Sequence, residues 1–300
     1  NRIEGIVTTK ARIRSLVADK TTPRNRAEEE IMGYRDVLNT VHESYEHITL
    51  TSHIVLQLHR DLYAYSHKGI GGQFKNVQNS IIERLADGSE GERFKPLPTY
   101  ETPGAINEIC QGVNAVLQDK SIDPLLVIPV FIHDFLCIHP FNDGNGRMSR
   151  LLTTLLLYQN GYMIGKFISL EQKIERTKDS YYAALGESGV NWHRGEEDVV
   201  PFVKYMLCVI LAAYRDFESR IELLTTSLCA KDRIKIIISA TIGKVTKAGI
   251  RERQPDIAVS TVEKALKELV EEGFIERRGA GRSTFYIKTL QKINFHTKYI

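Results

Sequence analysis

Helical periodicity over the first 226 residues constrains the fold more than any other feature of this sequence. Apolar residues recur there at three- and four-residue spacings, and the alternating runs typical of strands are few. The pattern predicts a mainly α-helical domain. The expected helices lie at about 26–45, 50–66, 103–119, 124–138, 146–159, 168–186 and 196–226.

The segment from Gly69 to Gly104 interrupts this helical pattern. Six glycines and three prolines fall within it, so we expect a long loop with a short β-hairpin near 75–100. A loop of this length in a compact domain is usually functional.

Beyond about residue 228 shorter elements replace the long helices. Ser260 and Glu263 have the spacing of a capping box, before a helix that should stop at Gly273. Strand-like runs at 274–278 and 283–288 flank a turn. With two helical patterns at 230–241 and 246–253, the order resembles a winged helix-turn-helix.

Charge also separates this C-terminal segment from the rest of the chain. The whole chain has a net charge of +3, and its 42% hydrophobic content excludes a disordered or collagen-like protein. Residues 228–300 hold nine Lys and six Arg against eight acids, which is +7 and leaves −4 for the remainder. Arg277, Arg278 and Arg282 beside the expected turn would suit DNA phosphates. Mixed Glu and Lys on the preceding helix favour protein docking or dimerisation instead.

Residues 139–150, HPFNDGNGRMSR, are the most informative stretch. An apolar helix that starts at Asp123-Pro124 should end near His139, because Pro140 cannot continue it. Apolar residues at 148, 151, 152, 155 and 156 predict a buried helix that Asn160-Gly161 closes. The stretch is therefore a loop that opens a helix, and the loop is held between two packed helices.

Two features of this loop suit the binding of phosphates. Gly144 and Gly146 let backbone N–H groups turn together at the positive end of the following helix. Arg147 and Arg150 are three residues apart, so we expect both guanidinium groups to point to one side and grip further phosphates.

Two further side chains suit catalysis at such a site. Asp143 is placed to hold Mg²⁺ that bridges phosphates. His139, with the ordinary histidine pKa of about 6.5, can be neutral and accept a proton from an attacking hydroxyl. Base, metal ligand and phosphate grip together indicate phosphate transfer.

These residues resemble the Fic family, whose signature HxFx[D/E]GNGRxxR is present at every fixed position. Proteins of this family mostly transfer AMP from ATP to a Ser, Thr or Tyr hydroxyl of a target protein. The resemblance implies that His139 is the base and Asp143 the Mg²⁺ ligand. It also implies phosphate contacts from Gly144, Asn145 and Gly146, from Arg147 to the inner phosphates and from Arg150 to the terminal one.

Three other segments are similar to family features. The related Doc branch, which transfers a terminal phosphate, has a lysine where this chain has Gly146, so nucleotidyl transfer is favoured. Residues 71–74, GGQF, and the loop to 104 resemble the target-docking flap, with Lys75 where arginine is common. Tyr181-Tyr182 resembles a segment near the adenine, although core aromatics would give the same pattern.

The start of the sequence resembles an inhibitory motif of the family, [S/T]xxxE[G/N]. Its glutamate pairs with the second motif arginine and blocks the terminal phosphate. Ile3-Glu4-Gly5 matches the end of that motif, and the Ser or Thr would precede Asn1. We therefore expect Glu4 to repress the enzyme in cis through Arg150, with a solvated terminal charge as the alternative.

Histidines at 42, 47, 53 and 59 offer no metal site, because no two of them form an i, i+4 pair. We interpret them as solvated or core residues and place none in the site. The longest apolar runs fall well short of the roughly 20 residues of a membrane span. No leader follows Asn1, so we expect a cytoplasmic protein whose sequence begins part-way into a longer chain.

The expected organisation has three parts. Residues 1–20 are an inhibitory N-terminal helix region, 21–226 a Fic-type catalytic domain with a short hairpin flap, and 227–300 a winged-helix module. The expected function is protein adenylyl transfer from MgATP to a target protein or to the chain itself. Removal of AMP from a modified protein, and a nucleotide-sensing DNA-binding regulator, are the alternatives. A homo-oligomer is left open.

Overall fold

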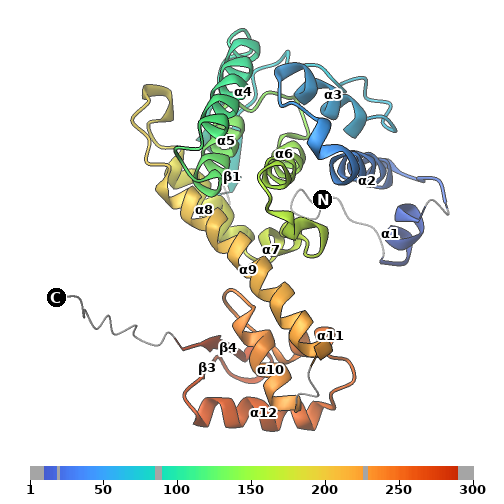
Figure 1. Ribbon diagram of the computed structural model, residues 1–300, viewed down its shortest axis with the longest axis vertical. Coiled ribbons are helices and arrows are strands. Elements are labelled where there is room, and N and C mark those ends of the chain that lie inside the picture. Colours follow the sequence, from blue (N-terminus) through green and yellow to red (C-terminus); the bar gives the residue numbers. More distant parts are fainter. Residues whose placement is uncertain (1–9, 19–20, 85–89, 226–228, 290–300) are drawn as a thin grey trace. The chain divides into compact units, whose positions relative to one another are not determined.

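The computed structural model describes residues 10–18, 21–84, 90–225 and 229–289 (Figure 1). The chain divides into two compact units, Asn1–Val209 and Ile210–Ile300, and the division falls within the long helix α9 (Val200–Thr225). The three-part division made from the sequence, with its boundary at 226, stays a prediction.

The first unit is built from helices, which confirms the predicted mainly α fold. Figure 1 shows α6 between α5 and α2. Helix α6 is the centre of this unit, because its side chains are buried from Arg147 to Tyr158. The helices are α1 (Lys10–Val17), α2 (Arg26–Ser44), α3 (Ser52–Leu62), α4 (Thr102–Asp119), α5 (Pro124–Ile138), α6 (Asn145–Gln159), α7 (Leu170–Arg176) and α8 (Lys178–Ser188).

Local signals in the sequence fix several helix ends. The Asp123 side chain accepts a hydrogen bond from the Leu125 N–H and so caps α5, as the Asp123-Pro124 pair predicted. Asn160 caps the C-terminal end of α6, and Gly161 follows it with φ +85°. Residues close in sequence therefore fix the start of α5 and the end of α6, the two helices that flank the motif loop.

The single helix predicted at 168–186 is wrong in one respect, because the structure has two helices there. Helix α7 ends before Thr177, whose backbone leaves the helical region at φ −120° and ψ 32°. The Thr177 hydroxyl bonds the Lys173 carbonyl at 3.0 Å and the Tyr205 hydroxyl at 2.8 Å. A contact with α9 thus stabilises a break that the local pattern does not show.

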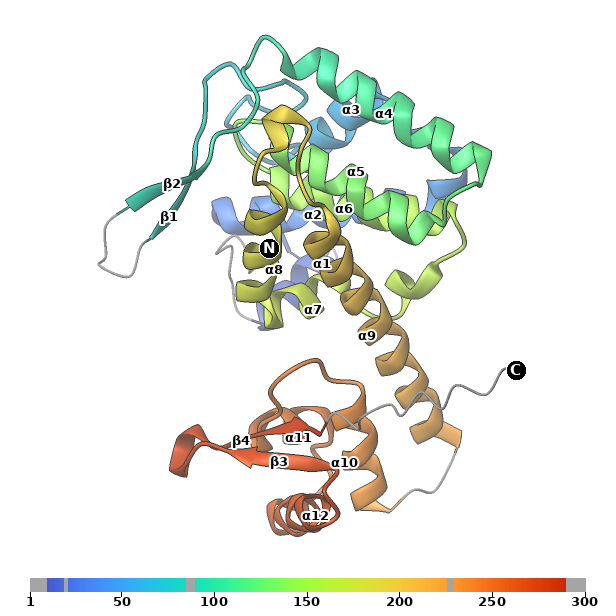
Figure 2. The ribbon, with the colours of Figure 1, turned by 90° about the vertical axis from the view of Figure 1, so that its left-hand side faces the viewer.

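A β-hairpin interrupts the helices where the sequence predicted one. Strand β1 (Ile81–Arg84) pairs antiparallel with β2 (Glu90–Phe94), with a register irregularity between Ile81 and Ile82. Figure 2 shows the hairpin projecting from the helices of its own unit.

The base of this hairpin is fastened to the segment between α8 and α9. The Phe94 ring stacks on His193, with centroids 5.5 Å apart and an interplanar angle of 10°. His193 Nε2 also bonds the Lys95 carbonyl oxygen at 2.8 Å. These contacts fix where β2 meets the helical body of this unit.

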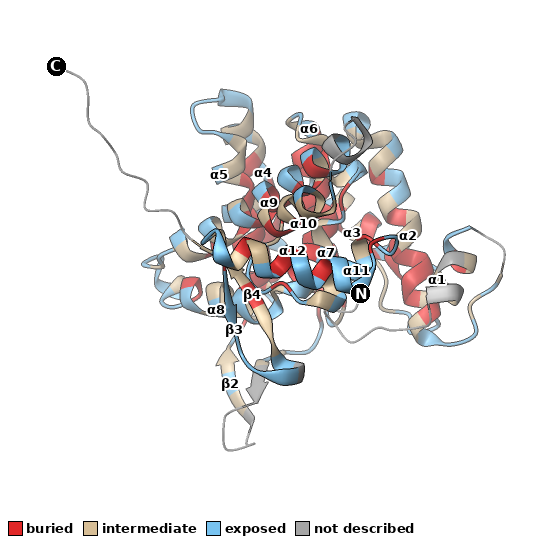
Figure 3. Ribbon diagram, turned by 90° about the horizontal axis from the view of Figure 1, so that it is seen from below, coloured by how far each residue is buried: buried red, intermediate tan, exposed pale blue. Residues whose placement is uncertain are grey.

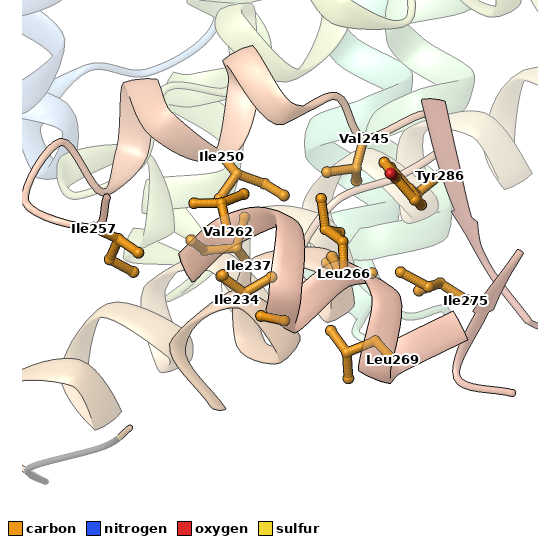
Figure 4. Close-up of a cluster of buried hydrophobic side chains, with 12 residues drawn as sticks. Ile234, Ile237, Val245, Ile250, Ile257, Val262, Leu266, Leu269, Ile275 and Tyr286 are labelled. Carbon is orange, nitrogen blue, oxygen red and sulfur yellow. The ribbon is translucent and has the colours of Figure 1, made fainter. Parts of the chain in front are cut away.

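The second unit has the predicted order of three helices and a hairpin. They are α10 (Ala230–Ser239), α11 (Lys247–Arg253), α12 (Val259–Glu271), β3 (Ile275–Arg278) and β4 (Phe285–Lys288). A bridge joins Val245 to Tyr286, and both side chains belong to one apolar core with residues of all three helices (Figure 4). The assignment of this unit to the winged-helix class stays a prediction.

Helix α12 corrects one local expectation. Its N-cap is Ala258, which makes no side-chain capping bond, so Ser260 and Glu263 lie inside the helix and form no capping box. Glu263 pairs instead with Lys247 of α11 at 2.7 Å. Four apolar side chains of α12 pack into the core of this unit, while most of the helix is exposed (Figure 3). They are Val262, Ala265, Leu266 and Leu269.

Among the described residues, no helix has both the length and the apolar character to cross a membrane.

Candidate active site

The loop between α5 and α6 is closed by its own side chains. Asn145 accepts a hydrogen bond from the Phe141 N–H at 2.9 Å and donates one to the Phe141 carbonyl at 2.7 Å. Gly144 stands at the N-cap of α6 with φ +89°, a conformation that favours glycine. The Asn145 side chain is thus committed to loop structure, and this residue would contact a phosphate through its backbone N–H.

His139 ends α5 in an unusual conformation. It has φ +52° and ψ 63°, and its N–H donates to the Phe135 carbonyl. Because a carbonyl can only accept, the 3.3 Å contact between Nδ1 and the Leu136 oxygen places the ring proton on Nδ1. Burial is the main cause that lowers the pKa of His139 to about 4, and the charge of Lys75 acts in the same direction. The ring is therefore neutral at pH 7, with the lone pair on Nε2.

A cavity of about 620 Å³ brings most of the predicted site residues together. Parts of the motif loop, the start of α6, the hairpin and α8 form its walls. The predicted residues that line it are His139, Asp143, Gly144, Asn145, Gly146, Arg150, Tyr181 and Tyr182.

Arg147 does not join them, and its side chain does not lie beside that of Arg150 as the spacing predicted. Its guanidinium group is fully buried, with Nη1 3.0 Å from Glu30 of α2 and Nη2 2.6 Å from the Tyr63 hydroxyl. Nη2 also lies 3.4 Å from Asp143. In this structure Arg147 ties α6 to α2 and to the segment after α3, so a contact with inner phosphates stays a prediction.

Arg150 lines the cavity and pairs with a carboxylate of the described chain. Its Nε donates to Glu171 of α7 at 2.9 Å. Burial acts to raise the pKa of Glu171, but the charge of Arg150 and a hydrogen bond from Tyr34 hold it below its ordinary value. Glu4 lies outside the described residues, so the predicted pairing of Glu4 with Arg150 stays a prediction.

Asp143 meets three cations. One carboxylate oxygen lies 2.7 Å from Lys68 and 3.3 Å from Arg26, and the other faces Arg147. Burial acts to raise the pKa of Asp143, but the hydrogen bond from Lys68 and the charge of Arg147 outweigh it and lower that pKa.

A Mg²⁺ ion would find a suitable donor in this carboxylate. Asp143 is ionised, lines the cavity and offers hard oxygen atoms. The described residues contain no cluster of three or more His, Cys, Asp or Glu side chains that could hold a metal alone. The arrangement fits an ion bound by one carboxylate and by the phosphates of a nucleotide, as is common for Mg²⁺.

The two tyrosines line the cavity together with the motif loop. Tyr181 is buried and packs against Phe202 and Tyr205, with its ring 5.2 Å from that of Tyr182. Arg93 of β2 donates to the Tyr182 carbonyl and lies 5.8 Å from the Tyr182 ring. Both predicted alternatives are therefore compatible with the structure, since the pair is aromatic core on one side and cavity wall on the other.

His59 is a residue of this site that the sequence did not reveal. It is fully buried, and its ring stacks on Phe141 of the motif with centroids 3.6 Å apart. Nδ1 accepts from the Gly72 N–H at 3.1 Å, so Nε2 carries the proton and donates to the Asp143 carbonyl at 3.0 Å. Burial lowers the pKa of His59 to about 4. The ring joins α3, the start of the flap segment and the motif loop.

Replacing His59 by leucine is expected to lower the free energy of unfolding by about 2–4 kcal/mol, because a buried, stacked imidazole is lost and two half-buried backbone groups each lose a partner. Urea titration of the chain measures this change. His53→Leu is the matched control, since His53 lies exposed on the same helix and should change little. Equal stability of the two variants would contradict a linking role for His59.

Several basic residues of the second unit are paired with acids of the same unit. Such exposed pairs are weak and would exchange readily for other anions. Neither the DNA nor the protein-docking prediction is decided by them. The pairs are Lys231 with Glu268 and Glu272, Arg233 with Asp256, Lys247 with Glu263 and Arg278 with Glu276.

Residues 49–157 match the family model described as Fic/DOC family. A probable protein adenylyltransferase of Aquifex aeolicus (strain VF5) is 36% identical over 98 residues, which cover 33% of this chain and 27% of that protein. Protein adenylyltransferase fic-1 of Caenorhabditis elegans is 26% identical over 166 residues, covering 54% of this chain and 28% of the relative. The chain therefore spans less than a third of the length of these two relatives.

Solved structures share the fold. A Fic domain containing signaling protein from Bacteroides thetaiotaomicron has a TM-score of 0.59 and 24% identity, covering 72% of this chain and 81% of that chain. A Fic family protein from Desulfovibrio desulfuricans G20 also has a TM-score of 0.59, with 20% identity, covering 97% of this chain and 84% of that one.

The helical unit with its motif loop between α5 and α6 has the Fic fold, as these structures show. The match over residues 49–157, which include the motif loop and most of α6, is to the Fic/DOC family model. This confirms the resemblance that the residues from His139 to Arg150 predicted.

Proposed function

We propose that this chain is a protein adenylyltransferase, which transfers AMP from ATP to the hydroxyl of a protein side chain. The observation that carries the proposal is the shared cavity of His139, Asp143, Arg150 and the N-terminal end of α6. The adenylyltransferase names of relatives from Aquifex aeolicus and Caenorhabditis elegans support it.

The residues of the cavity suit each requirement of this reaction. The hydroxyl oxygen of the target attacks the α-phosphorus, and Nε2 of His139 takes the hydroxyl proton. The bond between the α-phosphorus and the oxygen bridging to the β-phosphate breaks, and pyrophosphate leaves. The two products are pyrophosphate and a target protein that carries AMP through a phosphodiester bond. Backbone N–H groups at the start of α6 and the charge of Arg150 would hold the phosphates.

Asp143 is the residue that would hold Mg²⁺, which supplies positive charge against the phosphates when it is bound. Lys68 and Arg26 compete for the same carboxylate oxygen. Gly146 favours transfer of AMP over transfer of the terminal phosphate, because it stands where the Doc branch has lysine.

Regulation by Glu4 is a further part of the proposal and is supported by the resemblance of residues 3–5 alone. Such a carboxylate would neutralise Arg150 and occupy the place of the terminal phosphate. The Glu4→Gly variant should then modify proteins faster than the unchanged chain.

The proposal is tested with ATP labelled at the α- or at the γ-phosphate. We expect α-label on the chain itself or on proteins of an extract, more of it with Glu4→Gly and at most a trace with His139→Ala. Label on protein from ATP labelled at the γ-phosphate would show that the chain transfers the terminal phosphate instead of AMP. Release of AMP from a modified protein, without any α-label uptake, would favour hydrolytic removal of AMP, in which water attacks the phosphorus of the attached AMP and the protein hydroxyl leaves.

A further inference from the structure

Lys75 is a buried lysine beside the motif loop, and the catalytic scheme above does not use it. Only 3% of the residue is exposed, and it lies on the segment that leads from α3 to the hairpin. Its backbone N–H donates to the Pro140 carbonyl at 2.8 Å. Its Nζ donates to the Ile138 carbonyl, also at 2.8 Å. One residue of the flap segment therefore binds the carbonyl groups on both sides of His139.

The Ile138 carbonyl is a natural partner for a cation. It belongs to the last turn of α5, where carbonyl groups have no partner within the helix and carry the negative end of the helix dipole. An ammonium group there satisfies one of these carbonyls and interacts favourably with the dipole. The bond is charge-assisted and shielded from water, which strengthens it.

His139 needs such support because of its backbone. A non-glycine residue at φ +52° costs about 1–2 kcal/mol relative to the right-handed helical region. That conformation persists only where the surrounding structure fixes it. The two bonds from Lys75 hold the carbonyl groups of Ile138 and Pro140, the residues on either side of His139, and so restrict the direction in which the imidazole leaves the backbone.

We propose that Lys75 is a positioning residue for His139: its N–H and its ammonium group hold the carbonyl groups of the residues on either side of it and place a positive charge beside the base. The effect on rate rests on the proposed function, whereas the effect on the ring does not.

The electrostatics of the site agree with this role. Burial lowers the pKa of Lys75 to about 8, so the group is still charged at pH 7. After burial, the charge of Lys75 is the cause that lowers the pKa of His139, while the bond to the Leu136 carbonyl opposes it. The other charged groups on the walls of the cavity are Asp143, Arg150 and Arg93.

Lys75→Met and Lys75→Arg in the full chain separate charge from packing. Methionine fills the same buried space without a charge or a donor, and arginine keeps both. We expect Lys75→Met to lower kcat for α-label transfer by about 10- to 100-fold, with little change in KM for ATP. Arginine should restore most of kcat. Lys120→Met is the control, since Lys120 is an exposed C-cap lysine at the end of α4.

A second readout needs no activity. Titration of ¹³C-labelled histidines by NMR gives the pKa of His139, whose signal is identified by its loss in His139→Ala. That pKa should rise in Lys75→Met and stay near its original value in Lys75→Arg and Lys120→Met. If Lys75→Met fails to fold, Lys75→Gln serves, because its amide can donate without carrying a charge.

The NMR titration tests the role of Lys75 even if no protein is labelled at all. A folded Lys75→Met chain in which the pKa of His139 is unchanged would overturn the proposal, whatever the activity. So would equal losses of kcat in the methionine and arginine variants, since packing alone would then matter. A raised pKa in a chain that transfers no AMP would support the role of Lys75 and overturn only the proposed function.

Discussion

Replacing His139 by alanine should lower kcat for AMP transfer by about 10²- to 10⁴-fold, the usual contribution of a general base. The attacking hydroxyl would lose its proton acceptor, while the cavity that holds the nucleotide would keep its other walls. KM for ATP should therefore change little. Label from α-labelled ATP, followed over time at several ATP concentrations, measures both constants.

The pH profile of the unchanged chain provides a sharper test of the same role. Burial lowers the pKa of His139 to about 4, and only the neutral ring accepts a proton. Activity should therefore persist as pH falls through 6.5, where an exposed histidine would titrate, and decline only toward pH 4.

Two results would contradict this assignment. One is a decline in kcat centred near pH 6.5. The other is transfer at an undiminished rate by His139→Ala. His53→Ala, at an exposed position of α3, is the control for the loss of an imidazole elsewhere in the chain.

Sequence predicts this fold best where the determining residues are neighbours along the chain. Asp123 caps α5 through an N–H two residues away, and Asn160 with Gly161 closes α6 in the same local manner. The motif from His139 to Arg150 could be placed on a loop between two helices for the same reason.

Prediction fails where a distant segment decides the local structure. The break at Thr177 is stabilised by the Tyr205 hydroxyl of α9, and nothing in residues 168–186 indicates it. Ser260 and Glu263 have the spacing of a capping box, but they lie inside α12, which begins at Val259. Burial of its apolar side chains stabilises this helix without a side-chain cap.

The same limit applies to the candidate site. Spacing along α6 placed Arg147 beside Arg150, but a carboxylate on α2 draws Arg147 into the core. The partners of His59 could not be recognised in the sequence, because Gly72 and Asp143 are distant along the chain and come close to it only when the chain folds. The motif thus indicates which chemical groups the site contains, whereas the direction of each side chain depends on partners from other helices.

Replacing Arg147 by methionine is expected to lower the free energy of unfolding by about 3–5 kcal/mol, the usual cost of breaking one partner out of a buried ion pair. Glu30 is 2% exposed and Arg147 1%, so the carboxylate would stay buried and lose its buried partner, keeping only cations that reach it from more exposed positions. Urea titration followed by circular dichroism measures the change. Arg26→Met is the matched control, because Arg26 pairs with the other oxygen of Glu30 from an exposed position and should cost less than about 1 kcal/mol.

A double variant then separates a structural role of Arg147 from a role in binding phosphate. Arg147→Met combined with Glu30→Leu removes both charges, so much of the lost stability should return. If Arg147 serves only to join α6 to α2, transfer of AMP by the double variant should recover with its stability. A stable double variant whose KM for ATP stays raised would instead show that this guanidinium group contacts the nucleotide, as the family signature implies. Losses of stability that simply add in the double variant would contradict the coupling of Arg147 with Glu30.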